Sequence, residues 1–244
     1  MFNYKIVIEY DGLKFNGWQK QKNSQNTIQE KLEDAISTVL KENINIIGAG
    51  RTDAGVSAMG QVANFKSQIK INNGNFLHSI NSILPPEITV KNIKKVPLNF
   101  HSRFSAKKRE YIYQITTAKK SISRKYFYRL NYNINFNIID EFIKYILGYK
   151  SFKSLCKAET DKHNFFCNLY VLSYKVFKSR NEIYFRIIAD RFLRSMVRGI
   201  IGALVDLGRG KLDLKTTKEQ FNKGERIKTT YLPANALFLK KIYY

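Results

Sequence analysis

The residues best suited to chemistry lie in one glycine-rich stretch, GAGRTDAGVSAMGQVANF, at positions 48–65. Asp53 is a single carboxylate in a turn between Gly50 and Gly55, and Arg51 lies two residues before it. Neighbouring guanidinium groups favour an ionised carboxylate, which suits nucleophilic attack better than general acid catalysis. The glycines would let the backbone approach a ligand closely. The alternative is a structural turn in which Asp53 pairs with Arg51, and spacing alone favours neither interpretation.

Other chemistries fit the sequence poorly. The spacing of Gly48, Gly50 and position 53 is that of a G-x-G-x-x-G loop, but Asp53 would repel a pyrophosphate there. The chain has no G-K-S or G-K-T sequence, so a P-loop is excluded. Its three histidines and two cysteines have no metal-ligand spacing, and no serine lies in a nucleophile elbow. We therefore expect neither a cofactor nor a metal.

Charge is the strongest global feature of this 244-residue chain. Lys and Arg number 42 against 19 Asp and Glu, a net charge of +23. Such a surplus predicts a surface for a polyanion, although lysine-rich solvated faces would also produce it. Nucleic acid is favoured over a membrane, because no basic amphipathic helix and no apolar run of ~18 residues occurs. The first residues do not resemble a signal peptide, and the cysteines fit reduced packing residues, so we expect a cytoplasmic protein.

The periodicity of apolar residues predicts an α+β protein in which helices flank mostly antiparallel sheets. We expect two domains, 1–105 with the glycine loop and 106–244. Strands are expected at 4–10, 43–50, 61–65, 88–96, 109–116, 169–179, 182–190 and 236–244. Helices are expected at 27–41, 75–84, 138–148 and 191–208. Thr27 and Glu30 have capping-box spacing at the start of the first helix.

The motif GRTDAGVSAMGQV resembles the signature of the TruA-type tRNA pseudouridine synthases. Further blocks match that family in the same order along nearly the whole chain. They are YDGLKFNGWQKQ with TIQEKLEDAI, INSILPPEITV, FHSRFSAKKREYIYQI and FLRSMVRGIIGALVDLGRG. The resemblance implies the pseudouridine synthase fold, with a basic cleft between two α+β subdomains.

The resemblance also implies a role for four residues. Asp53 matches the catalytic nucleophile, and Arg51 the arginine that helps displace the target nucleotide from its stack. Tyr111 matches the tyrosine that lies against the target base, and Arg198 the arginine that pairs with the catalytic carboxylate. Without the family, Tyr111 would be read as a strand aromatic and Arg198 as a solvated helix charge.

The sequence departs from the family pattern at a few places. Ser57 stands where a histidine is common, and we expect no chemical role for it. Ala236, in LPANALFL, stands where the family has the glycine of a Pro-x-x-Gly-Leu turn. The HNFFCNLY segment also matches the family poorly.

The implied reaction answers why one carboxylate would suffice. Glycosidases use two carboxylates because an alkoxide leaving group needs a proton, whereas a uracil anion spreads its charge over two carbonyls. The resemblance implies uridines 38 to 40 of the tRNA anticodon stem-loop as targets, no cofactor, and a homodimer. Attack at C1′ of the sugar and attack at C6 of the base both remain open. The rival hypothesis is a non-enzymatic RNA-binding protein, to which a carboxylate in a basic groove would bring nothing.

Overall fold

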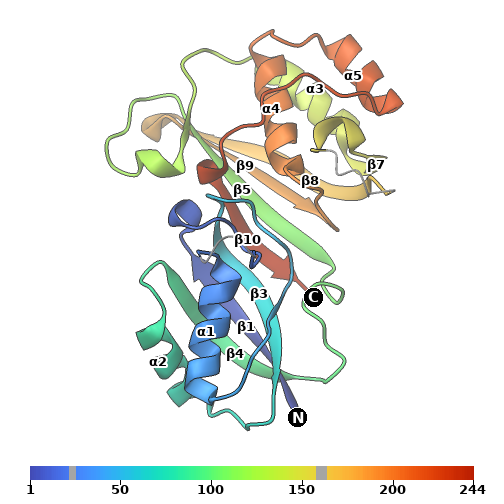
Figure 1. Ribbon diagram of the computed structural model, residues 1–244. Coiled ribbons are helices and arrows are strands. Elements are labelled where there is room, and N and C mark those ends of the chain that lie inside the picture. The colour runs from blue at the N-terminus through green and yellow to red at the C-terminus, as the bar shows by residue number, and fades with distance from the viewer. Residues whose placement is uncertain (22–25, 158–163) are drawn as a thin grey trace. The chain divides into compact units, whose positions relative to one another are not determined.

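The computed structural model describes residues 1–21, 26–157 and 164–244 (Figure 1). Contacts divide the chain into two compact units. Unit 1 comprises Met1–Lys107 and Phe238–Tyr244, and unit 2 comprises Lys108–Leu237. The described residues contain five α-helices and mostly antiparallel strand pairs, so the predicted α+β class is confirmed.

Unit 1 is built on a sheet with the strand order β4-β1-β3-β10, and the short β2 also pairs with β3. Its strands are β1 (Phe2–Tyr10), β2 (Ile47–Gly48), β3 (Ser57–Ser67), β4 (Ile88–Val96) and β10 (Leu237–Tyr243). Strand β1 is antiparallel to both neighbours, whereas β10 runs parallel to β3. Alternate side chains of β1, among them Tyr4, Ile6 and Ile8, are buried, as a strand with one face on the core requires.

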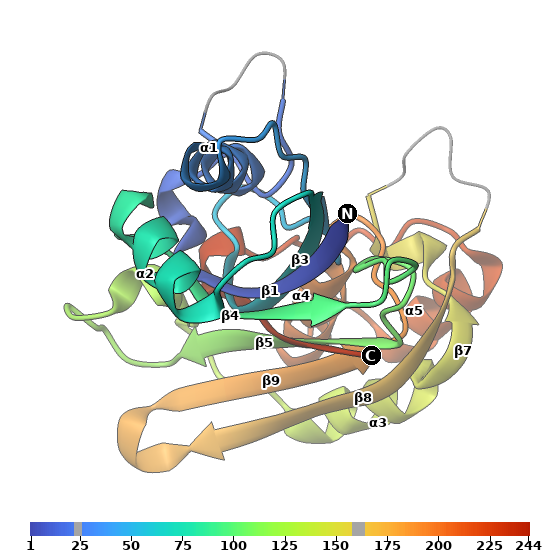
Figure 2. The same ribbon diagram turned by 90° about the horizontal axis from the view of Figure 1, so that it is seen from below.

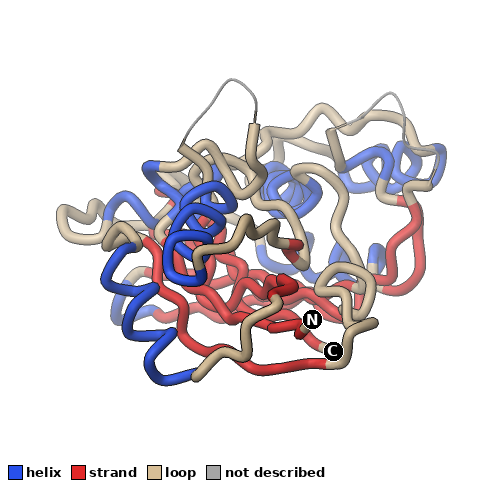
Figure 3. The backbone as a smooth tube through the Cα atoms, turned by 60° about the horizontal axis from the view of Figure 1, so that its bottom comes forward, coloured by secondary structure: helices blue, strands red, loops and turns tan. Residues whose placement is uncertain are grey.

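Two helices cover one face of the unit 1 sheet, α1 (Ile28–Leu40) and α2 (Asn73–Ile83) (Figures 1 and 3). One hydrogen bond of the capping box expected at the start of α1 is present, because Glu30 N donates to Thr27 Oγ1 at 3.3 Å. Helix α2 ends before Pro85, which is the end that the sequence predicts. The Thr27 cap therefore sets the start of α1, and Pro85 sets the end of α2.

The strands of unit 2 have the order β5-β9-β8-β7, and β6 pairs with β5. Its strands are β5 (Lys108–Thr116), β6 (Tyr128–Arg129), β7 (Gly148–Ser151), β8 (Phe166–Phe177) and β9 (Glu182–Ala189). The expected hairpin between β8 and β9 is confirmed. It turns at Asn181, whose φ of 54° lies in the left-handed region that asparagine tolerates.

Three helices gather on one face of the unit 2 sheet, α3 (Phe136–Ile146), α4 (Met196–Gly208) and α5 (Leu214–Lys223) (Figures 1 and 2). The ring of Phe136 stacks on Tyr174 of β8, with centroids 5.0 Å apart. Five 3₁₀ turns complete the described elements. They are η1 (Gly12–Lys14), η2 (Arg124–Tyr126), η3 (Lys153–Leu155), η4 (Lys178–Arg180) and η5 (Ala234–Ala236).

Two element predictions were wrong in extent. The helix expected over 191–208 begins only at Met196, because Ser195 has a φ of 56° and breaks the helical path before it. The strand expected over 43–50 pairs only at Ile47 and Gly48. Helix α5 was not predicted, and its sequence LKTTKEQFNK has few apolar residues to show a period.

The last strand also differs from expectation. The sequence placed 236–244 with the second half, whereas β10 pairs with β3 in unit 1, at Phe238↔Ser57 and Leu239↔Ala58. The two strands approach closely, since a Cβ added at Gly60 would lie 2.7 Å from Lys240 O. The division into domains 1–105 and 106–244 stays a prediction.

Candidate active site

The glycine loop leads from β2 to β3 and carries Asp53 in a tight turn. Val56 N donates to Asp53 O at 3.1 Å, and Gly55, the third residue of this turn, has a φ of 81°. A positive φ at this position is accessible to glycine at low cost. The sequence attributed the turn to Gly50 as well, but Gly50 does not adopt a positive φ. Gly55 alone therefore meets the backbone requirement of this turn.

Gly50 instead borders open space, because a Cβ added there would meet no atom within 4 Å. Its carbonyl accepts from Gln61 Nε2 at 2.9 Å, which attaches this side of the loop to β3. Arg51 is exposed and Asp53 is half-buried. The structure thus brings Arg51 and Asp53 together on one loop that is open on its Gly50 side.

Thr52, between these two residues, anchors the loop in unit 1. Its side chain is buried, and Thr52 Oγ1 lies 2.8 Å from Tyr10 Oη at the end of β1. Thr52 O accepts from Trp18 N at 3.1 Å. Trp18 is 2% exposed and its ring lies 6.1 Å from that of Tyr10. The buried Thr52 therefore fixes the backbone directly before the candidate nucleophile.

Gly17 packs directly against the loop backbone. It has a φ of 92°, and a Cβ added there would lie 2.8 Å from Thr52 O and 3.3 Å from Asp53 C. A Cβ added at Gly48 would lie 2.6 Å from the indole of Trp18. The segment around Gly17 and Trp18 thus forms the support of the candidate catalytic loop, and sequence reasoning missed this role. The signal was available, because the only tryptophan in the chain directly follows a glycine.

Ser57, at the start of β3, has a structural role. It is buried, and Ser57 Oγ accepts from Gly12 N at 3.0 Å and donates to Asp11 Oδ1 at 3.4 Å. A Cβ added at Gly12 would lie only 2.0 Å from Val56 O. The hydroxyl therefore joins η1 to the end of the glycine loop.

Tyr111 lies in β5 of unit 2, where it pairs with Ile187 of β9. Its side chain is 9% exposed, and its ring meets Phe192 edge to face at 5.2 Å. Tyr113, two residues on, projects from the same face of the strand, and Tyr113 Oη donates to Pro233 O at 2.9 Å. The candidate base-contacting tyrosine is thus held in an aromatic setting on a rigid strand.

Arg198 lies in the first turn of α4 and is half-buried. Arg198 Nε donates to Leu232 O at 2.6 Å, and Leu232 N donates to Arg198 O at 3.4 Å. Burial raises the pKa of Tyr113, and the nearby charge of Arg198 partly opposes that rise. Arg198 is therefore a positioned cation close to β5, rather than a solvated helix charge.

The described part of the chain lacks the features of a metal site and of a membrane-spanning helix. It contains no group of three or more His, Cys, Asp or Glu side chains arranged to hold a metal ion. None of its helices is both long and apolar enough to cross a membrane. Cys156 and Cys167 are both buried, in agreement with their interpretation as packing residues.

Comparisons with known proteins extend these observations to the whole chain. A family model described as tRNA pseudouridine synthase matches residues 6–105 and 142–244. A tRNA pseudouridine synthase A from Bacteroides thetaiotaomicron is 37% identical over 246 residues, covering 100% of this chain and 91% of the relative. Another, from Chlorobium phaeobacteroides, is 38% identical over 247 residues, covering 100% of this chain and 94% of the relative. A third, from Thermodesulfovibrio yellowstonii, is 33% identical over 256 residues, with full coverage of both chains.

Proposed function

The chain belongs to the tRNA pseudouridine synthase family, and from this premise we propose that Asp53 is the nucleophile with which it converts uridine to pseudouridine in tRNA without a cofactor. Family membership makes the chain an isomerase. It also removes the rival hypothesis of a purely RNA-binding protein. The observation that carries the proposal is the geometry of the loop. Asp53 lies beside an exposed arginine, on a backbone that is anchored at Thr52 and open at Gly50.

The reaction requires that one bond to the base be exchanged for another. The N1–C1′ bond breaks, the uracil leaves with the electron pair, and C5 then bonds to C1′. The proton on C5 is lost and N1 regains one, so atoms and charge balance. Asp53 either attacks C1′ and holds the sugar as an ester or adds to C6 of the base, and its carboxylate is released at the end.

The other site residues have roles that suit their positions. Arg51 is exposed beside Asp53, so it is available to fill the space of a uridine extruded from its stack, a step that costs roughly a few kcal/mol. Arg198 supplies the positive charge that keeps a carboxylate ionised. Tyr111 lies against the target base, near the C5 proton. These roles come from family resemblance, and the contacts within each unit support them.

The finer substrate assignment also rests on family resemblance. We propose that the targets are uridines 38 to 40 of the anticodon stem-loop, and that the enzyme is a cytoplasmic homodimer with a basic cleft for tRNA. The net charge of +23 supports a polyanionic substrate. Mapping pseudouridine in tRNA from cells that lack the enzyme tests the positions, and loss of pseudouridine outside the anticodon arm, with positions 38 to 40 unchanged, would contradict them. Light scattering tests the dimer, since a mass of 28.5 kDa would mean a monomer.

The nucleophile is tested with Asp53→Asn, which keeps the size of the side chain but removes its charge. Tritium release from tRNA labelled at uridine C5 should fall by many powers of ten, because covalent attack is lost. The melting temperature should be unchanged, because asparagine keeps the size of the side chain in the turn. The affinity for tRNA should not fall, because a negative charge is removed from an RNA-binding surface. Asp34→Asn is the matched control, because it removes one charge from the exposed side of α1 in the same unit.

The opposite pattern would refute the assignment. If Asp53 only caps a turn, Asp53→Asn should lower the melting temperature while the folded fraction continues to release tritium. Measurable turnover in folded Asp53→Asn protein, at the level of the Asp34→Asn control, would exclude Asp53 as the nucleophile.

A further inference from the structure

We propose that Asp206 is a positioning residue that sets the guanidinium of Arg198 through the segment 229–232. In this scheme Asp206 and Arg198 do not contact each other, and the segment 229–232 transmits the effect of Asp206 to Arg198. The inference rests on the proposed function, in which Arg198 acts on the catalytic carboxylate. It extends that proposal to a residue that would otherwise be read as part of the core.

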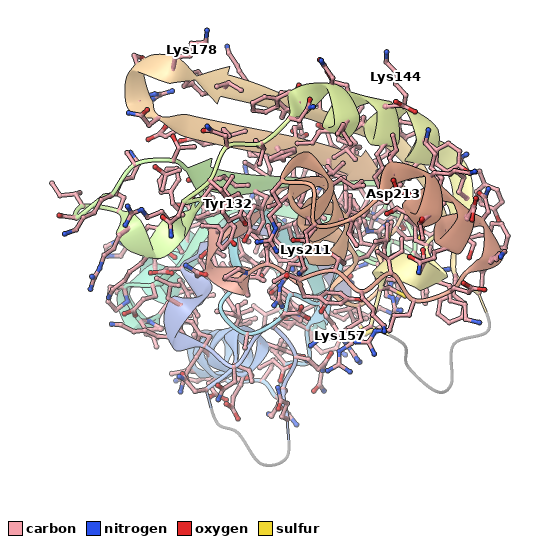
Figure 4. The ribbon with its side chains drawn as sticks, turned by 90° about the horizontal axis from the view of Figure 1, so that it is seen from above. Tyr132, Lys144, Lys157, Lys178, Lys211 and Asp213 are labelled. Carbon is pink, nitrogen blue, oxygen red and sulfur yellow. The ribbon has the colours of Figure 1, made fainter. Side chains whose placement is uncertain are left out.

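Asp206 is a buried carboxylate in α4 whose two oxygens are both engaged. The residue is 1% exposed. Asp206 Oδ2 accepts from Thr230 N at 3.0 Å, from Thr229 Oγ1 at 3.0 Å and from Lys211 Nζ at 3.3 Å. Asp206 Oδ1 lies 2.6 Å from Arg209 Nη2. Lys211 lies just beyond the end of α4 (Figure 4). Asp206 thus connects α4 to the start of the segment 229–232.

The pKa of Asp206 fits this arrangement. Burial is the largest single influence and would raise the pKa, but the hydrogen bonds from Thr230 N and Thr229 Oγ1 and the charges of Lys211 and Arg209 together outweigh it. The pKa is therefore below its ordinary value. The carboxylate is ionised at neutral pH, so its hydrogen bonds to the segment are charge-assisted and strong.

The segment lies directly on the backbone of α4. A Cβ added at Gly202 would lie 1.9 Å from Thr230 O, and one added at Gly199 would lie 3.1 Å from the ring of Tyr231. Gly202 precedes Asp206 by four residues, so the two share one face of the helix. A glycine there removes the side chain that would otherwise hold the segment away from the carboxylate.

The same face continues to Arg198, four residues before Gly202. Residues 198 and 206 are two turns apart, roughly 12 Å along the axis at 1.5 Å per residue. At the Arg198 end of the segment, Leu232 O accepts a hydrogen bond from Arg198 Nε, and Leu232 N donates one to Arg198 O. Because a guanidinium is planar and rigid, a fixed Nε–H also fixes the plane of its two Nη groups. Moving Leu232 O would therefore turn the whole cation.

A purely structural role for Asp206 is the alternative, and it makes a different prediction. Substitution of a purely structural residue lowers the amount of folded enzyme. Its effect on turnover is therefore the same factor whether or not a second residue is also substituted. A residue that acts through Arg198 loses its effect once Arg198 is altered, because coupled sites are not additive. A double-mutant cycle therefore separates the two roles.

The experiment measures single-turnover tritium release and tRNA affinity for Asp206→Asn, Arg198→Lys and the double variant. Asp206→Asn keeps the shape of the side chain but removes its charge. We expect it to slow turnover at least tenfold with tRNA affinity within about twofold. In the Arg198→Lys background the same change should slow turnover less than about threefold. A tenfold loss in both backgrounds, or a fall in affinity that accounts for the loss, would overturn the inference.

Asp213→Asn is the matched control. Asp213 also accepts from one backbone N–H and one threonine hydroxyl, Thr216 N and Thr216 Oγ1, both at 2.8 Å, but it is exposed at the start of α5 (Figure 4). Its substitution should leave turnover unchanged. A loss equal to that of Asp206→Asn would mean that any weakened cap in unit 2 slows the enzyme, and the inference would fail.

Thr229→Val provides a milder variant in case Asp206→Asn folds poorly. It removes one hydrogen bond to Asp206 and should slow turnover in the same direction by a smaller factor. Hydrogen exchange at Thr230 N should quicken in both variants, and exchange that quickens without slower turnover would refute the scheme. If Arg198→Lys itself has wild-type turnover, the inference falls, whereas the proposed nucleophile is judged separately by Asp53→Asn.

Discussion

Gly17→Ala tests whether the segment before α1 positions the candidate nucleophile. Gly17 has a φ of 92°, and a Cβ there would lie 2.8 Å from Thr52 O. Gly148 has the same φ, but a Cβ added there would meet nothing within 4 Å. The two substitutions therefore share the backbone strain and differ in the clash with the loop.

The expected loss of stability has two parts, the backbone strain and the clash with the loop. An L-residue in left-handed backbone costs roughly 1–2 kcal/mol, which both variants incur. Ordinary Cβ contacts begin at 3.4 Å, so the backbone at Thr52 must retreat by about 0.6 Å in Gly17→Ala. Overpacking of this kind adds roughly 1–3 kcal/mol. At roughly 2–4 °C per kcal/mol, Gly17→Ala should melt several degrees below Gly148→Ala.

Activity should separate the variants more strongly than stability does. A misplacement of 1 Å can cost about a hundredfold in rate, so a shift of the Asp53 backbone should slow tritium release by about tenfold or more. Gly148→Ala should turn over at the wild-type rate at a temperature where both variants are folded. If the two variants had the same melting temperature and the same turnover, the claim that Gly17 supports the loop would be refuted.

Further outcomes are expected from the same structure. Ser57→Ala should lower the unfolding free energy by about 1–3 kcal/mol, because a buried N–H loses its acceptor, with turnover within about tenfold of wild type; a thousandfold loss would contradict its structural role. Gly202→Ala should destabilise by roughly 1–3 kcal/mol through its clash with a carbonyl, whereas Gly74→Ala in α2, with its nearest atom at 3.8 Å, should stabilise by up to about 1 kcal/mol; equal melting temperatures would contradict this. Burial raises the pKa of Cys167 to about 12, so its thiolate fraction at pH 8 is on the order of 10⁻⁴, and iodoacetamide should label it only after unfolding. Affinity for tRNA should fall steeply with salt, and an affinity unchanged between two salt concentrations would argue against an electrostatic interface.

Local chemistry made several elements predictable. Helix α1 follows from the Thr27–Glu30 cap and its apolar period, and the β8–β9 hairpin from a turn at Asn181, because each signal acts within a few residues. The start of α4 was predicted wrongly, because the apolar period continues through Ser195. The left-handed backbone of Ser195 has no distinct signal in the sequence. Periodicity predicts which face of an element is buried better than it predicts where the element begins.

The site was only partly accessible from the sequence. Asp53 and Gly55 could be singled out because the carboxylate and the turn glycine are only two residues apart in the chain. The supports of the site lie far away in sequence, such as Gly17 against Thr52 and the segment 229–232 on Asp206. Neither segment shows an apolar period, so its contacts are set by tertiary packing alone.

The position of β10 has a consequence for the order in which the enzyme is made. Its partner β3 is synthesised early, and the whole of unit 2, residues 108–237, is synthesised before β10 appears. Until then the edge of β3 at Ser57 and Ala58, a few residues after Asp53, lacks this partner, and an open strand edge invites pairing with other chains. A chain synthesised only as far as Leu237 therefore carries Asp53 beside an unfinished sheet. Modification of tRNA should therefore require that β10 is paired with β3.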